Sequence, residues 1–397
     1  MRIVIAPDKF KGTLTAVQAA NAMARGAREA IGKAELGLYP VADGGQGTLA
    51  TLLTAVGGST ASRLVTNPLG GQVEATVACL NNGSAVIEMA MASGLDLVAP
   101  ADRNALLATS FGTGELLEFV SSNEIDGKEV HRIVLGIGGS ASTDGGTGAA
   151  VALGWRFLDA HGEQLGPGGG ALGELAAIEP PPTARTFQEV EWIAACDVDA
   201  PLLGPTGAAR TFGPQKGASP AEVELLETGL TKLAEQIRID LGEDIARIPR
   251  SGAGGGMGAG AAAFFGARLE SGFDLVVASI ELEDAIDGAD LVLTGEGRLD
   301  EQSLMGKATI GVARLAARHG VPCLAVAGEV ALSARQLEDA GFVAAARLTQ
   351  ETGETTSSVW GGFGARPGDK GDCLPSLCLR TRYSVRADIW AAPPSRG

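Results

Sequence analysis

The stretch that decides the fold is RIVIAPDKFKGTLTAVQAANAMARGAREAIGKAELGLYPV, residues 2–41. It begins with an apolar run at 2–7, which predicts a short buried strand. An amphipathic stretch from about Thr15 to Ile31 then predicts a helix, and residues 36–41 predict a second strand. Strand, helix and strand in this order are typical of the opening of a parallel α/β sheet.

The same alternation returns near the other end of the chain. Strands are expected at 290–294, 323–327 and 342–347, separated by helices at 306–319 and 333–340. The middle differs, because two apolar runs at 73–79 and 84–90 flank the turn signal Asn81-Asn82-Gly83 and predict a hairpin. Further strands are expected at 132–136 and 192–196.

These patterns predict an α/β protein of two domains. A discontinuous parallel-sheet domain, Rossmann- or flavodoxin-like, is expected from residues 1–65 and 285–350, and a mixed α/β domain from 66–284 is inserted in it. A simple tandem of two domains is the alternative. Residues 351–397 differ in composition and show no helical or strand period, so we expect an atypical, poorly ordered tail.

Composition limits the classes of function. The net charge of −16 argues against a nucleic-acid partner, because phosphate neutralisation needs Lys and Arg in excess. No apolar segment has the length of a membrane span and no signal peptide is recognisable, so a cytoplasmic protein is expected. The 58 glycines indicate many tight turns or close backbone approaches. Nothing in the sequence indicates an oligomeric state.

The densest glycine segment is GIGGSASTDGGTG at 136–148, directly after a predicted strand. Gly136, Gly138 and Ala141 match the dinucleotide fingerprint G-x-G-x-x-A, but later glycines would then fall inside the helix that this fingerprint requires. We favour a longer loop that leads into a helix over about 147–158 and binds a phosphate at the start of that helix. The residues predicted to bind the nucleotide here are Gly138, Gly139, Ser140, Thr143 and Asp144.

Polar segments follow four predicted strands, at 6–16, 40–48, 196–218 and 294–313. A single acid or lysine in such a place is usually a solvated loop residue, but four glycine-flanked clusters indicate a site. Phosphoryl transfer needs this mixture: cations that neutralise the moving phosphoryl group, acids that hold Mg²⁺, and one acid that accepts the hydroxyl proton. The candidate residues are Asp8, Lys11, Asp43, Asp197, Lys216, Glu296, Asp300 and Lys307.

Several motifs together resemble the bacterial type 1 glycerate kinase family. They are APDKFKG, DGGQGT, GIGGSASTDGGTGAAVALG, CDVDAPLLGPTGAARTFGPQKGA, GAGGGMGAG and TGEGRLDEQSLMGKATIGVAR, in this order between residue 1 and about 345. The resemblance implies ATP-dependent phosphorylation of D-glycerate, usually to 2-phosphoglycerate, in a cleft between two α/β domains. Gln46 and Lys9 depart from the family pattern, which generally carries an acid and a serine there.

Within this interpretation, MgATP and D-glycerate meet in the cleft. Asp197 is the predicted general base because it follows a buried strand, with Asp8 as the alternative. Lys216 and Lys11 would hold the phosphates or the substrate carboxylate, and Lys307 would contact the nucleotide. The candidates for the Mg²⁺ shell are Asp43, Glu296 and Asp300.

Two other functions are compatible with the sequence. An NAD(P)-dependent hydroxy-acid dehydrogenase would use the fingerprint at 136–141. A non-catalytic hydroxy-acid-binding protein would use the same cleft without nucleotide turnover. The tail after about residue 350 lacks the family's usual terminal helix, which fits either a shifted reading frame or lineage-specific divergence.

Overall fold

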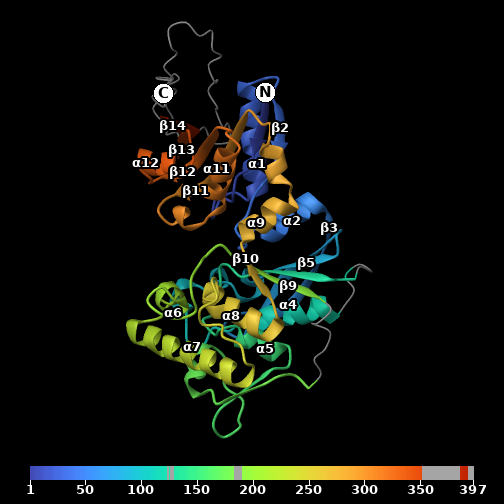
Figure 1. Ribbon diagram of the computed structural model, residues 1–397, viewed down its shortest axis with the longest axis vertical. Coiled ribbons are helices and arrows are strands. Elements are labelled where there is room, and N and C mark those ends of the chain that lie inside the picture. Colours follow the sequence, from blue (N-terminus) through green and yellow to red (C-terminus); the bar gives the residue numbers. More distant parts are fainter. Residues whose placement is uncertain (123–124, 126–128, 183–189, 351–384, 392–397) are drawn as a thin grey trace. The chain divides into compact units, whose positions relative to one another are not determined.

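The computed structural model describes residues 1–122, 125, 129–182, 190–350 and 385–391 (Figure 1). The chain forms two compact units. The first unit contains Met1–Ala42 and the chain from Val277 onward, and the second unit is Asp43–Val276. One sheet is almost wholly parallel and the other is mixed, so the predicted α/β class is confirmed.

The limits of the two units differ from the predicted domain boundaries at 65/66 and 284/285. Residues 43–65 lie in the second unit because strand β3 (Gly58–Thr66) pairs antiparallel with β4 (Gln72–Leu80) along its whole length. Helix α2 (Thr48–Val56) also packs on β4. The apolar pattern gave no sign of this pairing, since most of β3 is half-buried or exposed.

The first unit is built on a six-stranded sheet to which both ends of the chain contribute (Figure 1, blue and orange). Its strands, in spatial order, are β2 (Glu35–Leu38), β1 (Arg2–Ile5), β11 (Leu291–Leu299), β12 (Cys323–Val330), β13 (Ala344–Gln350) and β14 (Val385–Ala391). The first five are parallel. This is the flavodoxin-like order 2-1-3-4-5, whose switch point lies between β1 and β11. Ligands of such sheets bind beyond the carboxyl ends of the strands at that point.

Helices α1 (Ala16–Ala30), α10 (Leu282–Ile286), α11 (Ala308–Arg318) and α12 (Ala334–Asp339) belong to the same unit. Helix α1 begins at a capping box, in which the Thr15 side chain accepts from Gln18 N and the Gln18 side chain accepts from Thr15 N. Its apolar face carries Met23, which packs with Ile3 and Ile5 of β1. The amphipathic pattern therefore fixes α1 against the sheet.

Strand β14 lies within the segment 351–397, for which the sequence predicts a poorly ordered tail without strand period. It pairs antiparallel with β13, from Ala344↔Ala391 to Gln350↔Val385. Without β14 the edge of β13 would present a row of unpaired N–H and C=O groups, and pairing satisfies them. The remainder of the predicted tail, 351–384 and 392–397, lies outside the described residues.

The second unit contains the mixed sheet, with the order β10-β9-β6-β5-β4-β3. Its other strands are β5 (Ser84–Glu88), β6 (Arg132–Gly136), β9 (Glu191–Ala195) and β10 (Arg268–Glu270), which run parallel to their neighbours in that set. Strands β4 and β5 form the predicted antiparallel hairpin. The helices are α3 (Met89–Ser93), α4 (Phe111–Ser122), α5 (Thr147–Ala152), α6 (Ala208–Phe212), α7 (Pro220–Asp240), α8 (Ala253–Phe265) and α9 (Gly272–Ser279), which crosses the limit of the unit.

Helix α5 is shorter than the helix expected over 147–158. It ends at Ala152, and Gly154 follows with a φ of 91°, a left-handed conformation that glycine adopts without steric cost. The chain then forms β7 (Arg156–Leu158), which pairs antiparallel with β8 (Ala177–Glu179). The second half of the segment 147–158, for which one helix was predicted, thus belongs to a separate two-stranded sheet.

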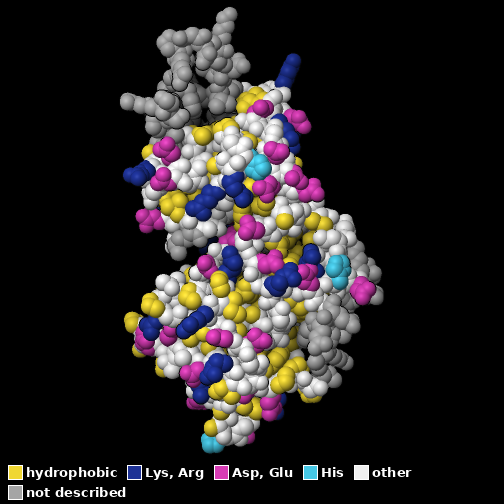
Figure 2. All heavy atoms as spheres, viewed as in Figure 1, with side chains coloured by type: hydrophobic (Ala, Val, Ile, Leu, Met, Phe, Trp, Pro, Cys, Tyr) yellow, Lys and Arg dark blue, Asp and Glu magenta, His cyan; other side chains and the backbone are white. Residues whose placement is uncertain are grey.

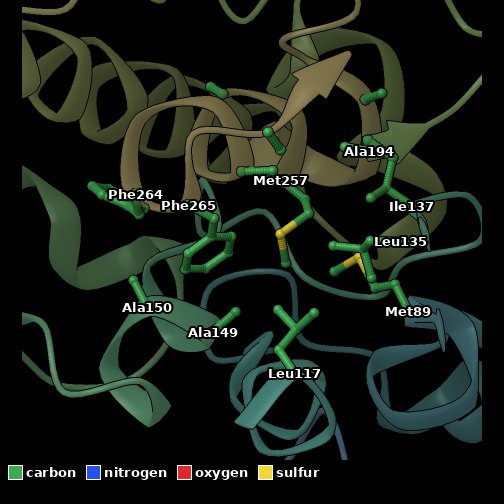
Figure 3. Packing of buried hydrophobic residues seen from close by; sticks show 14 of the residues in the cluster. Met89, Leu117, Leu135, Ile137, Ala149, Ala150, Ala194, Met257, Phe264 and Phe265 are labelled. Atoms are coloured by element: carbon green, nitrogen blue, oxygen red, sulfur yellow. The ribbon is translucent and has the colours of Figure 1, made fainter. Parts of the chain in front are cut away.

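A large apolar core supports the mixed sheet (Figure 3). Met257 and Phe265 of α8 point toward Ala149 of α5 and Leu117 of α4 in this view. The Phe265 ring also lies 5.4 Å from the Trp192 ring of β9, between centroids. Such packing holds the ends of β6 and β9 rigidly, which a precise site requires.

Candidate functional site

The first candidate cluster, here called the β6–β9 site, lies at the carboxyl ends of the adjacent parallel strands β6 and β9. A turn at 43–45 packs against these ends. Gly44 has a φ of 77°, and a Cβ there would lie 2.6 Å from the carbonyl oxygen of Ala195. A Cβ on Gly136 would in turn lie 2.6 Å from the carbonyl oxygen of Gly44. Only glycines permit this approach, which brings Asp43 near enough to Asp197 for their charges to interact.

Asp197 is the acid of this site. Its Oδ1 accepts a hydrogen bond from Ser271 Oγ at 2.6 Å, and its Oδ2 accepts from Phe273 N at 2.9 Å. Burial raises the pKa of Asp197 to about 6, with the Asp43 charge adding to the rise and the two hydrogen bonds opposing it. A carboxylate with a pKa close to neutrality is suited to accept a proton from a hydroxyl.

Lys216 is the cation of the same site and is only 2% exposed. Its Nζ donates to Ser140 Oγ at 2.9 Å and to the carbonyl oxygen of Ser142. Both partners are neutral, and burial lowers the pKa of Lys216 to about 7, while the charge of Asp144 opposes this shift. The ammonium therefore lacks a counter-ion within salt-bridge distance among the described residues, which leaves its charge available to an anionic ligand.

The loop 136–148 differs from the expected phosphate cradle at the start of α5. Asp144 is fully buried and accepts hydrogen bonds from the backbone N–H groups of Gly146 and Gly148, at 3.2 and 3.3 Å. It also accepts from the N and Oγ of Ser110, both at 2.8 Å. The donors at the start of α5 are thus taken by a protein carboxylate. Asp144 shapes the loop, whereas Ser140, nearer β6, is in direct contact with Lys216.

Two hydroxyls of this loop have no hydrogen-bond partner among the described residues, Ser142 Oγ and Thr143 Oγ1, although both are buried. The loop is held from its other side by three consecutive left-handed glycines, Gly254, Gly255 and Gly256. A Cβ on Gly255 would lie 2.0 Å from the carbonyl oxygen of Ser142. Packing against this loop therefore explains the glycines at 254–256 and Gly260, whereas Gly252 and Gly258 approach the backbone of Pro201 and Arg250.

The second candidate cluster, the β1–β11 site, lies in the first unit at the switch point of the parallel sheet. Asp8 follows β1, is 4% exposed, and accepts from Lys9 N at 2.6 Å through Oδ1. Its own N–H donates to the carbonyl oxygen of Gly295 in β11. Lys11 is exposed, and its backbone passes Gly297, where a Cβ would lie 3.2 Å from Lys11 N.

Glu296 and Lys307 form an ion pair in this second cluster, with Nζ 3.1 Å from Oε2. Strand β11 continues to Leu299, so Glu296 lies inside a strand, whereas the sequence pattern predicted a loop from residue 295. Burial raises the pKa of Glu296, and Lys307 opposes the rise. Glu296 Oε1 is buried without a hydrogen-bond partner among the described residues.

The three predicted Mg²⁺ ligands are divided between the two units. Asp43 belongs to the second unit, and Glu296 and Asp300 to the first. Asp300 Oδ1 accepts from the N–H groups of Gln302 and Ser303, while Oδ2 lies 3.3 Å from Arg298 Nε. The described residues contain no group of three or more metal-ligating side chains. The unsatisfied Oε1 of Glu296 fits a single carboxylate contact, which suffices for a Mg²⁺ held mainly by nucleotide phosphates.

Two functional candidates were not predicted from the sequence. Ser271 reaches Asp197 from a position 74 residues away, and no motif marks it. Arg250 has a φ of 68°, and its Nε is buried without a partner among the described residues. No sequence pattern indicates that an arginine has a positive φ.

The visible face carries its charges in a mixed pattern. Figure 2 shows Lys and Arg side chains interspersed with Asp and Glu on both units, without one continuous basic area. Among the described residues, no helix has both the length and the apolar character of a membrane span.

Known proteins match this chain over most of its length. Residues 3–361 match the sequence profile of the glycerate kinase family. A glycerate kinase of Halalkalibacterium halodurans is 45% identical over 87% of this chain and 90% of its own length. A glycerate 2-kinase of Escherichia coli K12 is 44% identical over 83% of this chain and 86% of its own length.

A solved structure agrees with these matches. A crystal structure from Salmonella typhimurium LT2, which carries a provisional glycerate kinase 2 name, superposes with a TM-score of 0.73 at 41% identity. The superposition covers 86% of this chain and 94% of the other. The sequence profile, the curated relatives and the fold thus agree, and the chain belongs to the glycerate kinase family.

Proposed function

We propose that the protein transfers the terminal phosphoryl group of ATP to a hydroxyl of D-glycerate, with 2-phosphoglycerate as the product. The observation that carries this proposal is the β6–β9 site, where a carboxylate with a pKa of about 6 and a buried ammonium with a pKa of about 7 lie on neighbouring loops. Family membership supports the nucleotide and the acceptor.

Asp197 acts as the general base in this proposal. The hydrogen bonds from Ser271 and Phe273 orient its carboxylate, and burial keeps its basicity high enough to take the proton of the attacking hydroxyl. The substrate hydroxyl can then attack the phosphoryl group while it transfers its proton to Asp197, so no free alkoxide has to form first. Asp8 stays the alternative base, because it is a buried acid that follows the end of β1.

Lys216 neutralises phosphoryl charge. A buried ammonium with only neutral partners interacts more strongly with an anion than an exposed lysine does, because little water screens it. Gly138, Gly139 and Ser140 bring backbone N–H groups and a hydroxyl to the same place, so we assign the nucleotide phosphates to this part of the loop.

The β1–β11 site would complete the nucleotide site. Glu296 would hold the Mg²⁺ through its unpartnered oxygen, and Lys307 and Lys11 would contact phosphate oxygens. Bound Mg²⁺ would neutralise charge on the phosphates during transfer. Asp43 and Asp300 stay weaker candidates. We also predict that the reaction takes place in a cleft between the two domains and that the protein is cytoplasmic.

The proposal is tested by coupled measurement of ADP release with a panel of hydroxy acids, including D-glycerate, L-glycerate and lactate. We expect turnover with D-glycerate, and NMR of the product identifies the phosphorylated hydroxyl. Phosphate on the 3-hydroxyl would contradict the assigned product. NADH-dependent reduction of a keto acid without ATP consumption would favour a dehydrogenase instead, and binding without any turnover would favour a non-catalytic protein.

A further inference from the structure

Arg250 lies in the turn that precedes α8. Its φ is 68°, and the only other non-glycine residue with a positive φ among the described residues is Glu281. A left-handed conformation is sterically unfavourable for an L-residue, whereas glycine at the same place adopts it without that cost. Twenty-four described glycines have a positive φ, so this chain uses glycine freely for such turns. An arginine retained here indicates a role for its side chain.

The Nε of Arg250 is buried and lacks a hydrogen-bond partner among the described residues. A buried donor without a partner loses the hydrogen bond that water would supply, so such groups call for a ligand or a specific explanation. Most other arginines near this sheet are paired, as Arg132 and Arg268 are with Glu191.

The position of the Arg250 turn is fixed beside the loop that carries Asp197. Gly252 N donates to the carbonyl oxygen of Ala200 at 2.9 Å, and Leu202 N donates to Ser251 Oγ at 3.0 Å. The guanidinium lies close enough to Cys196, the residue before Asp197, for its charge to act on that thiol. Arg250 is therefore a cation on a fixed turn near the end of β9, without an ion-pair partner among the described residues.

We propose that Arg250 binds the carboxylate of the acceptor hydroxy acid. The planar guanidinium offers paired N–H donors that match a carboxylate, and it stays charged at all relevant pH values. Binding there would place the hydroxyls of a small hydroxy acid toward the loop of Asp197. This inference rests on the proposed function for the identity of the acceptor, and it moves the carboxylate contact from Lys216 and Lys11 to Arg250.

Arg250→Gly is the decisive variant, because it removes the guanidinium and also relieves the backbone strain. We expect the KM for D-glycerate to rise about 10- to 100-fold, the loss typical of a charge-assisted contact, with the KM for ATP within about twofold of wild type. The thermal midpoint should equal or exceed that of the wild type. Arg250→Lys, which keeps charge and strain, should give an intermediate KM. The matched control is Arg247→Ala, an exposed arginine in the same segment, which should behave as wild type.

Calorimetric binding of D-glycerate, with a non-hydrolysable ATP analogue present, separates this inference from the proposed function. If the wild type binds glycerate and Arg250→Gly does not, the inference holds even if no turnover occurs. A lower thermal midpoint with an unchanged KM for glycerate would show a structural arginine and overturn the inference. A rise confined to the KM for ATP would also overturn it and assign Arg250 to a phosphate. Absence of glycerate binding by the wild type would overturn both proposals.

Discussion

The two candidate clusters contain the same kinds of group in opposite arrangements. In the β1–β11 site, Glu296 and Lys307 neutralise each other at 3.1 Å. In the β6–β9 site, Asp197 and Lys216 each have neutral hydrogen-bond partners. Burial consequently shifts both pKa values in the β6–β9 site toward neutrality, to about 6 and about 7. An acid and a base that form an ion pair stabilise each other and serve structure or ligand contact. An acid and a base without such a pair have shifted pKa values and can exchange a proton with a substrate or neutralise its charge.

The largest effect expected from this comparison is that of Asp197→Asn. Asparagine keeps the size of the side chain and removes its basicity, so kcat should fall about 10²- to 10⁴-fold with little change in either KM. The matched control is Asp199→Asn, an exposed acid two residues further along the same loop, which should retain most of the activity. More than a tenth of wild-type kcat in Asp197→Asn would move the base to Asp8.

Lys216→Met tests the other separated charge. We expect kcat to fall by about 10²-fold, because the lost interaction is with charge that develops during transfer. Burial lowers the pKa of Lys216 to about 7, so the cost of burying its ammonium is full below pH 7 and declines as the pH rises toward the ordinary lysine value of 10.5. The variant should therefore gain thermal stability relative to wild type, and gain more at pH 6 than at pH 9.

Activity and thermal midpoints of Lys216→Met at both pH values decide between two roles. If only the KM for glycerate rises, Lys216 is a carboxylate contact and the Arg250 assignment is weakened. If stability falls at both pH values, the hydrogen bonds to Ser140 and Ser142 outweigh the cost of burial, and the contrast between the two clusters fails.

The sequence predicted the loops on which the candidate residues lie better than it predicted the contacts that those residues make. Apolar runs followed by Gly and Asp mark strand ends, which is why the loops after β1, β6, β9 and β11 were found. The partners of Asp197 come from Ser271 and Phe273, and the pairing of residues so distant in sequence has no local signal. Asp144 was expected to face a nucleotide, but four hydrogen bonds to the loop and to Ser110 occupy it.

The same limit applies to the fold. Both sheets were predicted, since buried strands in this chain have dense apolar runs, as Ile3 to Ala6 does. Strand β3 was missed because it is an edge strand with a mainly exposed face. Strand β14 (VRADIWA) was missed although five of its seven residues are apolar, because it lies alone in the Pro- and Arg-rich end of the chain with no strand pattern beside it. An edge strand forms because it pairs with the free hydrogen-bonding groups of the neighbouring strand. A sequence pattern does not show which segment will do so.

The pH dependence of turnover should also separate the two clusters. If Asp197 is the base, it must be ionised, so kcat should fall about tenfold per unit as the pH drops below 6. The steady-state rate at saturating substrates, measured from pH 5 to 9, gives this profile. Asp43→Asn removes the neighbouring charge that raises the pKa of Asp197, so it should move the acidic limb to lower pH. If the acidic limb of the kcat profile stays at the same pH in Asp43→Asn, that limb reports the titration of a group other than Asp197.

The smallest effect is expected for the paired cluster, from Lys307→Met. It leaves Glu296 buried without its ion pair, and because Lys307 is 33% exposed the loss of stability should be modest, about 1 kcal/mol at pH 8. Burial raises the pKa of Glu296, and removing Lys307 raises it further, so the folded protein binds a proton there more readily than the unfolded chain. The deficit should therefore shrink as the pH falls toward 5. Urea unfolding at both pH values measures it, with the exposed Lys33→Met as control. A deficit that is equal at both pH values would show that Lys307 stabilises the first unit by packing, and the ion pair would then not explain why the two clusters differ.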